Sequence, residues 1–270
     1  MSTRDKVVFA TGPSGLSPEA APLREMLAWL LTGRLGVEVE INALPTYGAL
    51  AEALREGLDC AWLPPALYVM AERDRCARLL LAGVRAHTAN FFGALFVRAD
   101  SPFVRASDLQ GSRAAWVSPE SCSGYLMPRL ELKRLGLDPA RTFASEEMLE
   151  SHQNVVAAVT SGRADVGATY LSFASDGASG AIARAGWLDA RPPAAMRVLV
   201  TAGPIPSDVV VVSPSTPSDR ADALADVLST LHRHPRGATL LSQFFGVDWF
   251  ERAQPVRYDA VRAALLSSRS

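Results

Sequence analysis

The sequence predicts an α/β fold with largely parallel sheet structure, arranged as two lobes. Short apolar runs alternate with segments of helical period from the first residues onward, a pattern typical of α/β layering. The 270 residues suffice for one large domain or two of ordinary size. Apolar segments near Leu95 and Leu199 indicate that the chain leaves the first lobe and later returns to it. We therefore expect lobe one at 1–95 plus 201–270 and lobe two at 96–200, joined by two crossing strands that permit hinge closure.

The first lobe is expected to alternate strands and helices. A strand at 7–10 leads into Gly12–Pro13–Ser14–Gly15, a turn-forming run. Leucines at helical spacing predict a helix over 23–31, which Gly33 and Gly36 end. Pro64 and Pro65 open another helix, because proline is well tolerated in a first helical turn. The remaining expectations are strands at 37–41, 59–63 and 79–84, and helices at 47–55 and 65–73.

The second lobe and the return to the first follow the same reasoning. A long apolar run at 91–97 and shorter ones at 113–117 and 165–169 predict strands, and Gly136 ends a helix expected over 123–135. A Ser/Gly-rich stretch at 172–179 predicts a loop. The further expectations are a helix at 152–161, strands at 196–202 and 209–212, a helix near 218–232, and two helical segments at the C-terminus.

Composition excludes several classes of function. Net charge is −1, with 27 basic and 28 acidic residues, so no basic field exists to bind nucleic acid or an anionic membrane. The three cysteines (Cys60, Cys76 and Cys122) show no CxxC spacing, which argues against a disulfide framework or a zinc site. We expect no cofactor and no direct membrane insertion. With no export signal in the sequence as written, a cytoplasmic location is expected, or a periplasmic one if a signal has been removed.

One segment, Val117 to Pro128, has the composition of an anion-binding loop. It lies between a predicted strand and a predicted helix, where the first amides of the helix have no internal partners and the helix dipole adds partial positive charge. Ser121, Cys122 and Ser123 add side-chain donors. The result is a neutral cradle suited to a tetrahedral oxyanion. The alternative is that Ser123 merely caps the helix.

The order of motifs along the chain resembles a known family. Asp108–Arg113 is followed by Ser121–Pro128, Leu135–Pro139, Ser151–Val159 and Gly162–Ala168, with Pro45–Tyr47 and Asp59–Leu63 earlier and Pro204–Asp208 later. This order resembles the phosphate/phosphite/phosphonate-binding proteins of ABC transporters, which are type II periplasmic binding proteins. The resemblance covers roughly residues 7–246. It implies the type II periplasmic-binding-protein fold, with a ligand bound between the lobes.

Carried over by position, the resemblance implies a set of ligand-binding residues. Ser121, Cys122 and Ser123 would contact the anion oxygens. His152 would donate a further hydrogen bond, and Tyr47 would reach in from the first lobe. Hydroxyl and imidazole donors satisfy an oxyanion without burying a full opposing charge.

Two acidic positions and two departures from the family pattern complete the expected site. Asp165 and Asp208 correspond to positions where such proteins can hold an amino group of the ligand. Cys122 stands where threonine is usual, and a thiol is a weak donor. Phe91 stands where a hydrogen-bonding tyrosine is common. Both departures make the cleft more apolar, which favours an organic phosphonate or a different acid over bare phosphate.

For four of these residues a purely structural interpretation stays open. His152 could be a surface cap at a helix start. Asp165 could close the turn after Gly162. Tyr47 could pack against Trp62, and Asp208 could be a solvated aspartate in a loop.

The sequence thus predicts a non-catalytic, monomeric solute-binding protein that clamps a small phosphorus oxyanion for ABC uptake or ligand sensing, with a permease or a sensory protein as partner. One alternative is an enzyme with Cys122 as nucleophile, His152 as base and Asp165 orienting the histidine. Another is a cytoplasmic sensory or regulatory domain that binds a different small organic acid.

Overall fold

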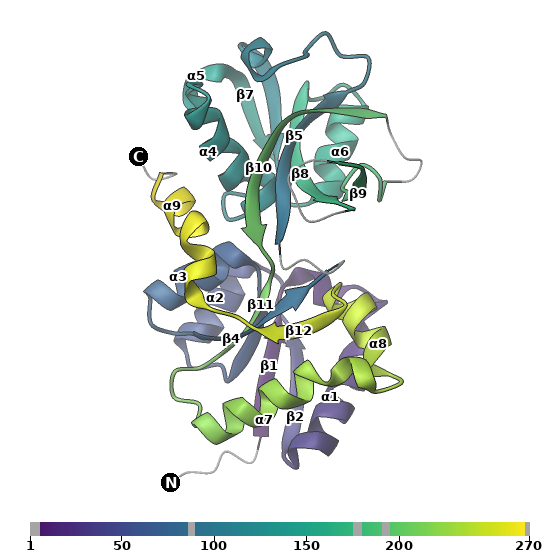
Figure 1. The fold of residues 1–270 in the computed structure, drawn as a ribbon, viewed down its shortest axis with the longest axis vertical. Helices are drawn as coiled ribbons and strands as arrows, with labels where there is room; N and C mark the ends of the chain where they lie inside the picture. The colour runs from purple at the N-terminus through teal and green to yellow at the C-terminus, as the bar shows by residue number, and fades with distance from the viewer. Residues whose placement is uncertain (1–5, 86–89, 175–179, 191–194, 268–270) are drawn as a thin grey trace. The chain divides into compact units, whose positions relative to one another are not determined.

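The structure, a computed structural model, describes residues 6–85, 90–174, 180–190 and 195–267. The chain forms two compact units (Figure 1): unit 1 comprises Met1–Ala89 and Ser207–Arg257, and unit 2 comprises Asn90–Pro206 and Tyr258–Ser270. Each unit has its own sheet flanked by helices, so the expected α/β class is confirmed. Both sheets mix parallel and antiparallel pairs, where largely parallel sheets were expected. Within the described residues, no helix is long and apolar enough to cross a membrane.

Unit 1 contains a sheet of order β12-β4-β11-β3-β1-β2. Helices α1 and α7 pack on this sheet through one apolar cluster, which includes Phe9, Leu27 and Leu228. Gly36 ends α1 as predicted: its φ of +69° is left-handed, and its amide donates to the carbonyl of Thr32. The elements are β1 (Lys6–Thr11), α1 (Ala20–Leu35), β2 (Glu38–Ala43), α2 (Tyr47–Arg55), β3 (Cys60–Leu63), α3 (Pro65–Arg73), β4 (Arg78–Val84), β11 (Val209–Val212), α7 (Ser218–Ser229), α8 (Gly237–Thr239) and β12 (Trp249–Arg252).

Unit 2 contains a sheet of order β10-β5-β8-β6-β7, with β9 paired to β8. Alternate residues of β5 enter two different cores: Phe96 lies in the cluster with α6, and Leu95 lies in the cluster with α4. The sheet is therefore covered on both faces (Figure 1). The elements are β5 (Asn90–Arg98), β6 (Ser112–Trp116), a π-helical turn (Cys122–Leu126), α4 (Met127–Arg134), α5 (Pro139–Thr142), β7 (Phe143–Met148), α6 (His152–Thr160), β8 (Val166–Phe173), β9 (Ile182–Ala185), β10 (Met196–Pro206) and α9 (Asp259–Ser267).

The unit boundaries differ from the expected ones in three places. Strand β5 belongs to unit 2 from Asn90 onward, and β10 pairs with it antiparallel from Met196 to Pro206. The long β5–β10 ladder keeps both strands in unit 2 along their whole length (Figure 1). The C-terminal helix α9 also belongs to unit 2, so the chain passes between the units a third time, after Arg257. The two expected C-terminal helical segments are present, at 237–245 and 259–267, and the structure adds strand β12 between them. Strand β8 extends to Phe173 into the predicted loop, of which 175–179 lies outside the described residues.

Candidate functional site

The carboxyl ends of the parallel strands in unit 2 bring the predicted loop and His152 to one edge of the sheet. Strands β6 and β7 are parallel, with Trp116 beside Met148. The two segments stay hydrogen-bonded to each other beyond the ends of the strands. The amides of Leu149 and Glu150 donate to the carbonyls of Trp116 and Val117, at 2.9 and 2.8 Å. The loop that follows Val117 and helix α6, which begins at His152, therefore start from the same edge.

Ser121 caps the π-helical turn at this edge. Its hydroxyl oxygen accepts a hydrogen bond of 3.0 Å from the amide of Gly124, and its backbone is extended. This observation corrects the alternative in which Ser123 is the cap. A hydroxyl that accepts from an amide still has its own proton to donate, so Ser121 remains able to bind an anion.

Ser123 and Cys122 follow the cap, and each is 4% exposed. Among the described residues, the Ser123 hydroxyl has no hydrogen-bond partner. The turn is held tightly from two sides. A Cβ added at Gly124 would lie 2.4 Å from Val117 Cγ2, and one added at Gly93 of β5 would lie 2.9 Å from the Ser123 carbonyl oxygen. The glycines therefore allow the loop to pack closely on the strand behind it.

His152 is held by side chains of strand β8 and is not the helix cap. The cap is Ser151, which accepts from the Asn154 amide at 3.1 Å. The His152 ring lies edge-on to Tyr170, and its Nδ1 is 3.0 Å from the hydroxyl oxygen of Thr169, which is fully buried. Burial lowers the pKa of His152 to about 4. The imidazole is therefore neutral at pH 7, with one nitrogen bonded to Thr169 and the other available.

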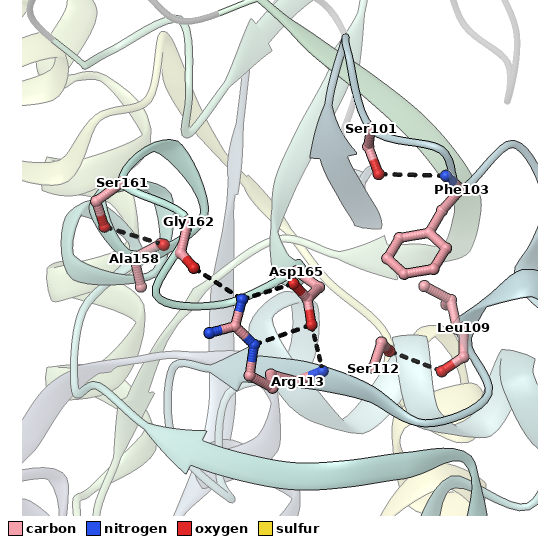
Figure 2. A network of polar contacts seen from close by, with 9 residues as sticks. All are labelled: Ser101, Phe103, Leu109, Ser112, Arg113, Ala158, Ser161, Gly162 and Asp165. Carbon is pink, nitrogen blue, oxygen red and sulfur yellow. Dashed lines mark hydrogen bonds and ion pairs between the residues drawn. The ribbon is translucent and has the colours of Figure 1, made fainter.

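Asp165 lies at the opposite edge of the same sheet, and it binds Arg113 (Figure 2). Its carboxylate accepts from the Arg113 amide at 2.8 Å and forms an ion pair of 2.7 Å with the guanidinium, which also donates to the Gly162 carbonyl. These bonds lower the pKa of Asp165. Since Arg113 is the second residue of β6 and Ser121 follows the far end of that strand, about 10 Å of strand or more separates Asp165 from the loop. Asp165 ties β6 to the turn that precedes β8, and the structure does not bring it together with the loop and His152.

Phe91 lies near the start of β5 and is half-buried. Strand β5 is antiparallel to β8, with Phe92 opposite Leu171 near the carboxyl end of β8. The first residues of β5 therefore lie at the edge that presents Ser121 and His152. The structure brings Phe91, Ser121, Cys122, Ser123 and His152 to this edge of unit 2.

Tyr47 occupies the corresponding edge of unit 1. It begins α2 shortly after β2 ends, and its ring lies against the backbone of Gly12, which follows the end of β1. A Cβ added at Gly12 would lie 2.6 Å from Tyr47 Cε1. The aromatic partners that the structure gives Trp62 are Phe245 and Phe250.

The Tyr47 hydroxyl is a neutral donor. Burial of the group and the nearby charge of Asp208 raise the pKa of Tyr47 to about 12, although 38% of the residue surface is exposed. The phenol therefore keeps its proton throughout the physiological range.

Asp208 lies at the same edge of unit 1 and is half-buried, not a solvated loop residue. Its Oδ2 forms an ion pair of 2.7 Å with Arg85, which follows the end of β4. Sequence reasoning missed Arg85, because 123 residues separate it from its partner and no local pattern marks the pair. It also missed Thr169, which lies inside an apolar strand and touches His152 only through the fold.

The described residues contain no group of three or more His, Cys, Asp or Glu side chains placed to hold a metal ion.

Comparison with known proteins assigns the family. The family described as ABC transporter, phosphonate, periplasmic substrate-binding protein matches residues 9–258. Among solved structures, XAC2383 from Xanthomonas citri bound to ATP is 26% identical with a TM-score of 0.77, covering 98% of each chain. PhnD1 from Prochlorococcus marinus in complex with methylphosphonate is 18% identical with a TM-score of 0.78, covering 98% of each chain.

A third structure shares the same fold. The binding protein component of an ABC phosphonate transporter from Pseudomonas aeruginosa is 17% identical, with a TM-score of 0.77, and the match covers 98% of this chain and 86% of that one. These likenesses confirm the expected type II periplasmic-binding-protein fold. With its family matched over nearly its whole length, the chain belongs to the periplasmic substrate-binding proteins of phosphonate ABC transporters.

Proposed function

We propose that the protein is a non-catalytic solute-binding protein that binds a small phosphorus oxyanion, such as phosphate, phosphite or a phosphonate. The loop Ser121–Ser123 and His152 of unit 2 supply the main donors, and Tyr47 of unit 1 supplies another. Phe91 adds an apolar contact at the edge of unit 2. The observation that carries the proposal is the Ser121-capped turn, with the largely buried residue Ser123 beside it.

The charge state of these groups favours an oxyanion ligand. His152, with a pKa of about 4, and Tyr47, with a pKa of about 12, are both uncharged at pH 7. In the neutral tautomer whose Nδ1 accepts a hydrogen bond from the Thr169 hydroxyl, the ring proton is on Nε2, from which it can be donated to a ligand. Neutral donors in a shielded site bind an anion without the cost of desolvating a second charge.

The transport role follows from the family. We propose that the protein works in the periplasm as a monomer and delivers its ligand to an ABC permease. A sensory role would use the same fold and the same site, and co-purification with a permease or with a signalling protein would separate the two roles.

The geometry argues against catalysis by Cys122. Asp165, the residue expected to orient the histidine, lies at the other edge of the sheet, and His152 Nδ1 is bonded to Thr169 instead. A histidine with a pKa of about 4 is a weak base for a thiol at neutral pH. We therefore expect slow alkylation of Cys122 by iodoacetamide, at a rate unchanged in His152→Ala.

A thermal-shift screen followed by calorimetric titration tests the proposed ligand class. The panel comprises phosphate, phosphite, methylphosphonate, 2-aminoethylphosphonate and sulfate. ATP is included because the Xanthomonas citri structure contains it. A ligand that binds only the folded state raises the midpoint of unfolding by mass action. A shift with a small phosphorus oxyanion and none with sulfate supports the proposal, whereas a shift with ATP alone would move the assignment to a nucleotide.

Variants then locate the site. Ser123→Ala should weaken binding by about 1–2 kcal/mol, the scale of a charge-assisted hydrogen bond. Ser145→Ala is the matched control, because Ser145 is exposed on β7 of the same unit. Equal affinities for the two variants would contradict the placement of the ligand at the loop.

A further inference from the structure

A fixed ion pair lies at the edge of unit 1 that presents Tyr47. Arg85 directly follows β4 and Asp208 directly precedes β11, and these antiparallel strands pair with Val209 opposite Ala82. The Asp208 carbonyl also accepts from the Gly83 amide at 3.0 Å, which sets the backbone of the pair. Both side chains remain about one-quarter exposed, so a bound solute can sense their charges.

The guanidinium of Arg85 is held by more than Asp208. Its Nε donates to the Gly246 carbonyl at 2.6 Å, and its other nitrogens lie 3.4 Å from Ser207 Oγ and 3.5 Å from the Phe245 carbonyl. Phe245 and Gly246 end the π-helical segment Leu240–Phe245, where helix carbonyls present partial negative charge. Arg85 therefore stays in place whether or not a ligand approaches Asp208.

This arrangement cancels the negative charge that an ammonium group would need. A cation that approaches Asp208 meets the Arg85 guanidinium, 2.7 Å from the same carboxylate, and gains little net attraction. The ammonium would also lose its hydration without finding an unpaired partner, which is costly. A neutral or apolar substituent has no such cost.

We propose that Arg85 and Asp208 form a selectivity element, which admits phosphorus oxyanions with an uncharged substituent and disfavours those with an ammonium group. The inference rests on the proposed function and narrows it to phosphate, phosphite and alkylphosphonates. It also replaces the expectation that Asp208 holds an amino group of the ligand.

The test compares two ligands of nearly equal size, ethylphosphonate and 2-aminoethylphosphonate, by calorimetric titration at pH 7. We expect the wild-type protein to bind ethylphosphonate at least about tenfold more tightly, the scale of one unfavourable charge contact near a protein surface. Arg85→Met removes the cation and leaves Asp208 unpaired, so the preference should fall by about tenfold or reverse. Arg85→Met combined with Asp208→Asn should restore the wild-type preference. Arg78→Met is the matched control, since Arg78 begins the same strand β4 at the opposite edge.

The outcomes separate the inference from the function on which it rests. Equal affinities of the wild-type protein for the two ligands, or an unchanged ratio in folded Arg85→Met, would overturn the selectivity element and leave the oxyanion site intact. Failure of every phosphorus oxyanion to bind would refute the proposed function, and the inference with it. The wild-type ratio requires no variant, so the test holds even if Arg85→Met does not fold.

Discussion

The buried contact between Thr169 and His152 gives a sharp test of how the site is organised. Thr169 Oγ1 is 3.0 Å from His152 Nδ1, and Thr169 is 0% exposed. The backbone of Gly186 closes the other side, because a Cβ added there would lie 2.2 Å from Thr169 Oγ1. Because Thr169 is fully buried and closely packed, we expect that bulk solvent does not replace the hydrogen bond when the hydroxyl is removed.

Thr169→Val is the perturbation of choice, because valine keeps the shape of threonine and removes the hydroxyl. The change deletes one hydrogen bond and leaves a ring nitrogen unpaired, which costs about 1–3 kcal/mol when the group is buried. We expect the free energy of unfolding to fall by that amount. The His152 ring also loses the bond that fixes its tautomer and orientation, so the Kd for the bound phosphorus oxyanion should rise by about tenfold.

Urea denaturation and calorimetric titration of the folded variant measure the two effects separately. Thr169→Ser keeps the hydroxyl and should retain affinity. Thr160→Val is a matched control in the neighbouring helix, where the hydroxyl donates only to the Val156 carbonyl, and it should change stability without changing affinity. Wild-type stability and affinity in Thr169→Val would refute the role of Thr169 in positioning His152.

Three further predictions follow from other contacts. Gly124→Ala places a methyl group against Val117 and the capping Ser121, so it should lower the free energy of unfolding by about 1–3 kcal/mol and weaken oxyanion binding; a melting temperature equal to wild type would contradict the tight packing. Asp165→Asn should cost about 1 kcal/mol, since the ion pair with Arg113 is partly exposed, with affinity unchanged; a weaker affinity in titration would return Asp165 to the site. The pKa of His152 is about 4, against an ordinary 6.5, so its contribution to stability is present above pH 6.5 and is lost as the pH falls to about 4. Urea unfolding across this range should show that the free energy of unfolding of His152→Gln varies with pH by up to about 3 kcal/mol less than that of the wild-type protein. The same pH dependence in both proteins would count against the shift.

The sequence predicted most elements of the fold through local signals. The Gly36 cap, the proline-opened helix α3 and the apolar strand β5 all depend on residues close together in the chain. The missed strand β7 has the opposite character. Strand β7 is the outermost strand of its sheet, and its residues 144–148 are all exposed. Its sequence therefore contains no apolar alternation, and its pairing with β6 is visible only in the folded structure.

The site was predictable to the extent that its residues form motifs. Ser121, Ser123 and His152 stand in short patterns that place them after a strand or at a helix start. Asp165 and Asp208 depend on distant arginines instead. Their arginine partners lie 52 and 123 positions away in the sequence. Only proximity in the folded structure decides whether each carboxylate is available to a ligand or already bound to an arginine.

The C-terminal helix has a consequence for dissecting this protein into parts. Helix α9 packs against α4, β10 and the π-helical turn that bears Cys122 and Ser123, and it buries Val261 and Ala264. A fragment that ends at Pro206 would lack helix α9 and its contacts. A C-terminal truncation would likewise remove the packing of α9 against the π-helical turn at Cys122–Leu126. An exchange of lobes between relatives therefore needs three junctions, because the final helix travels with unit 2.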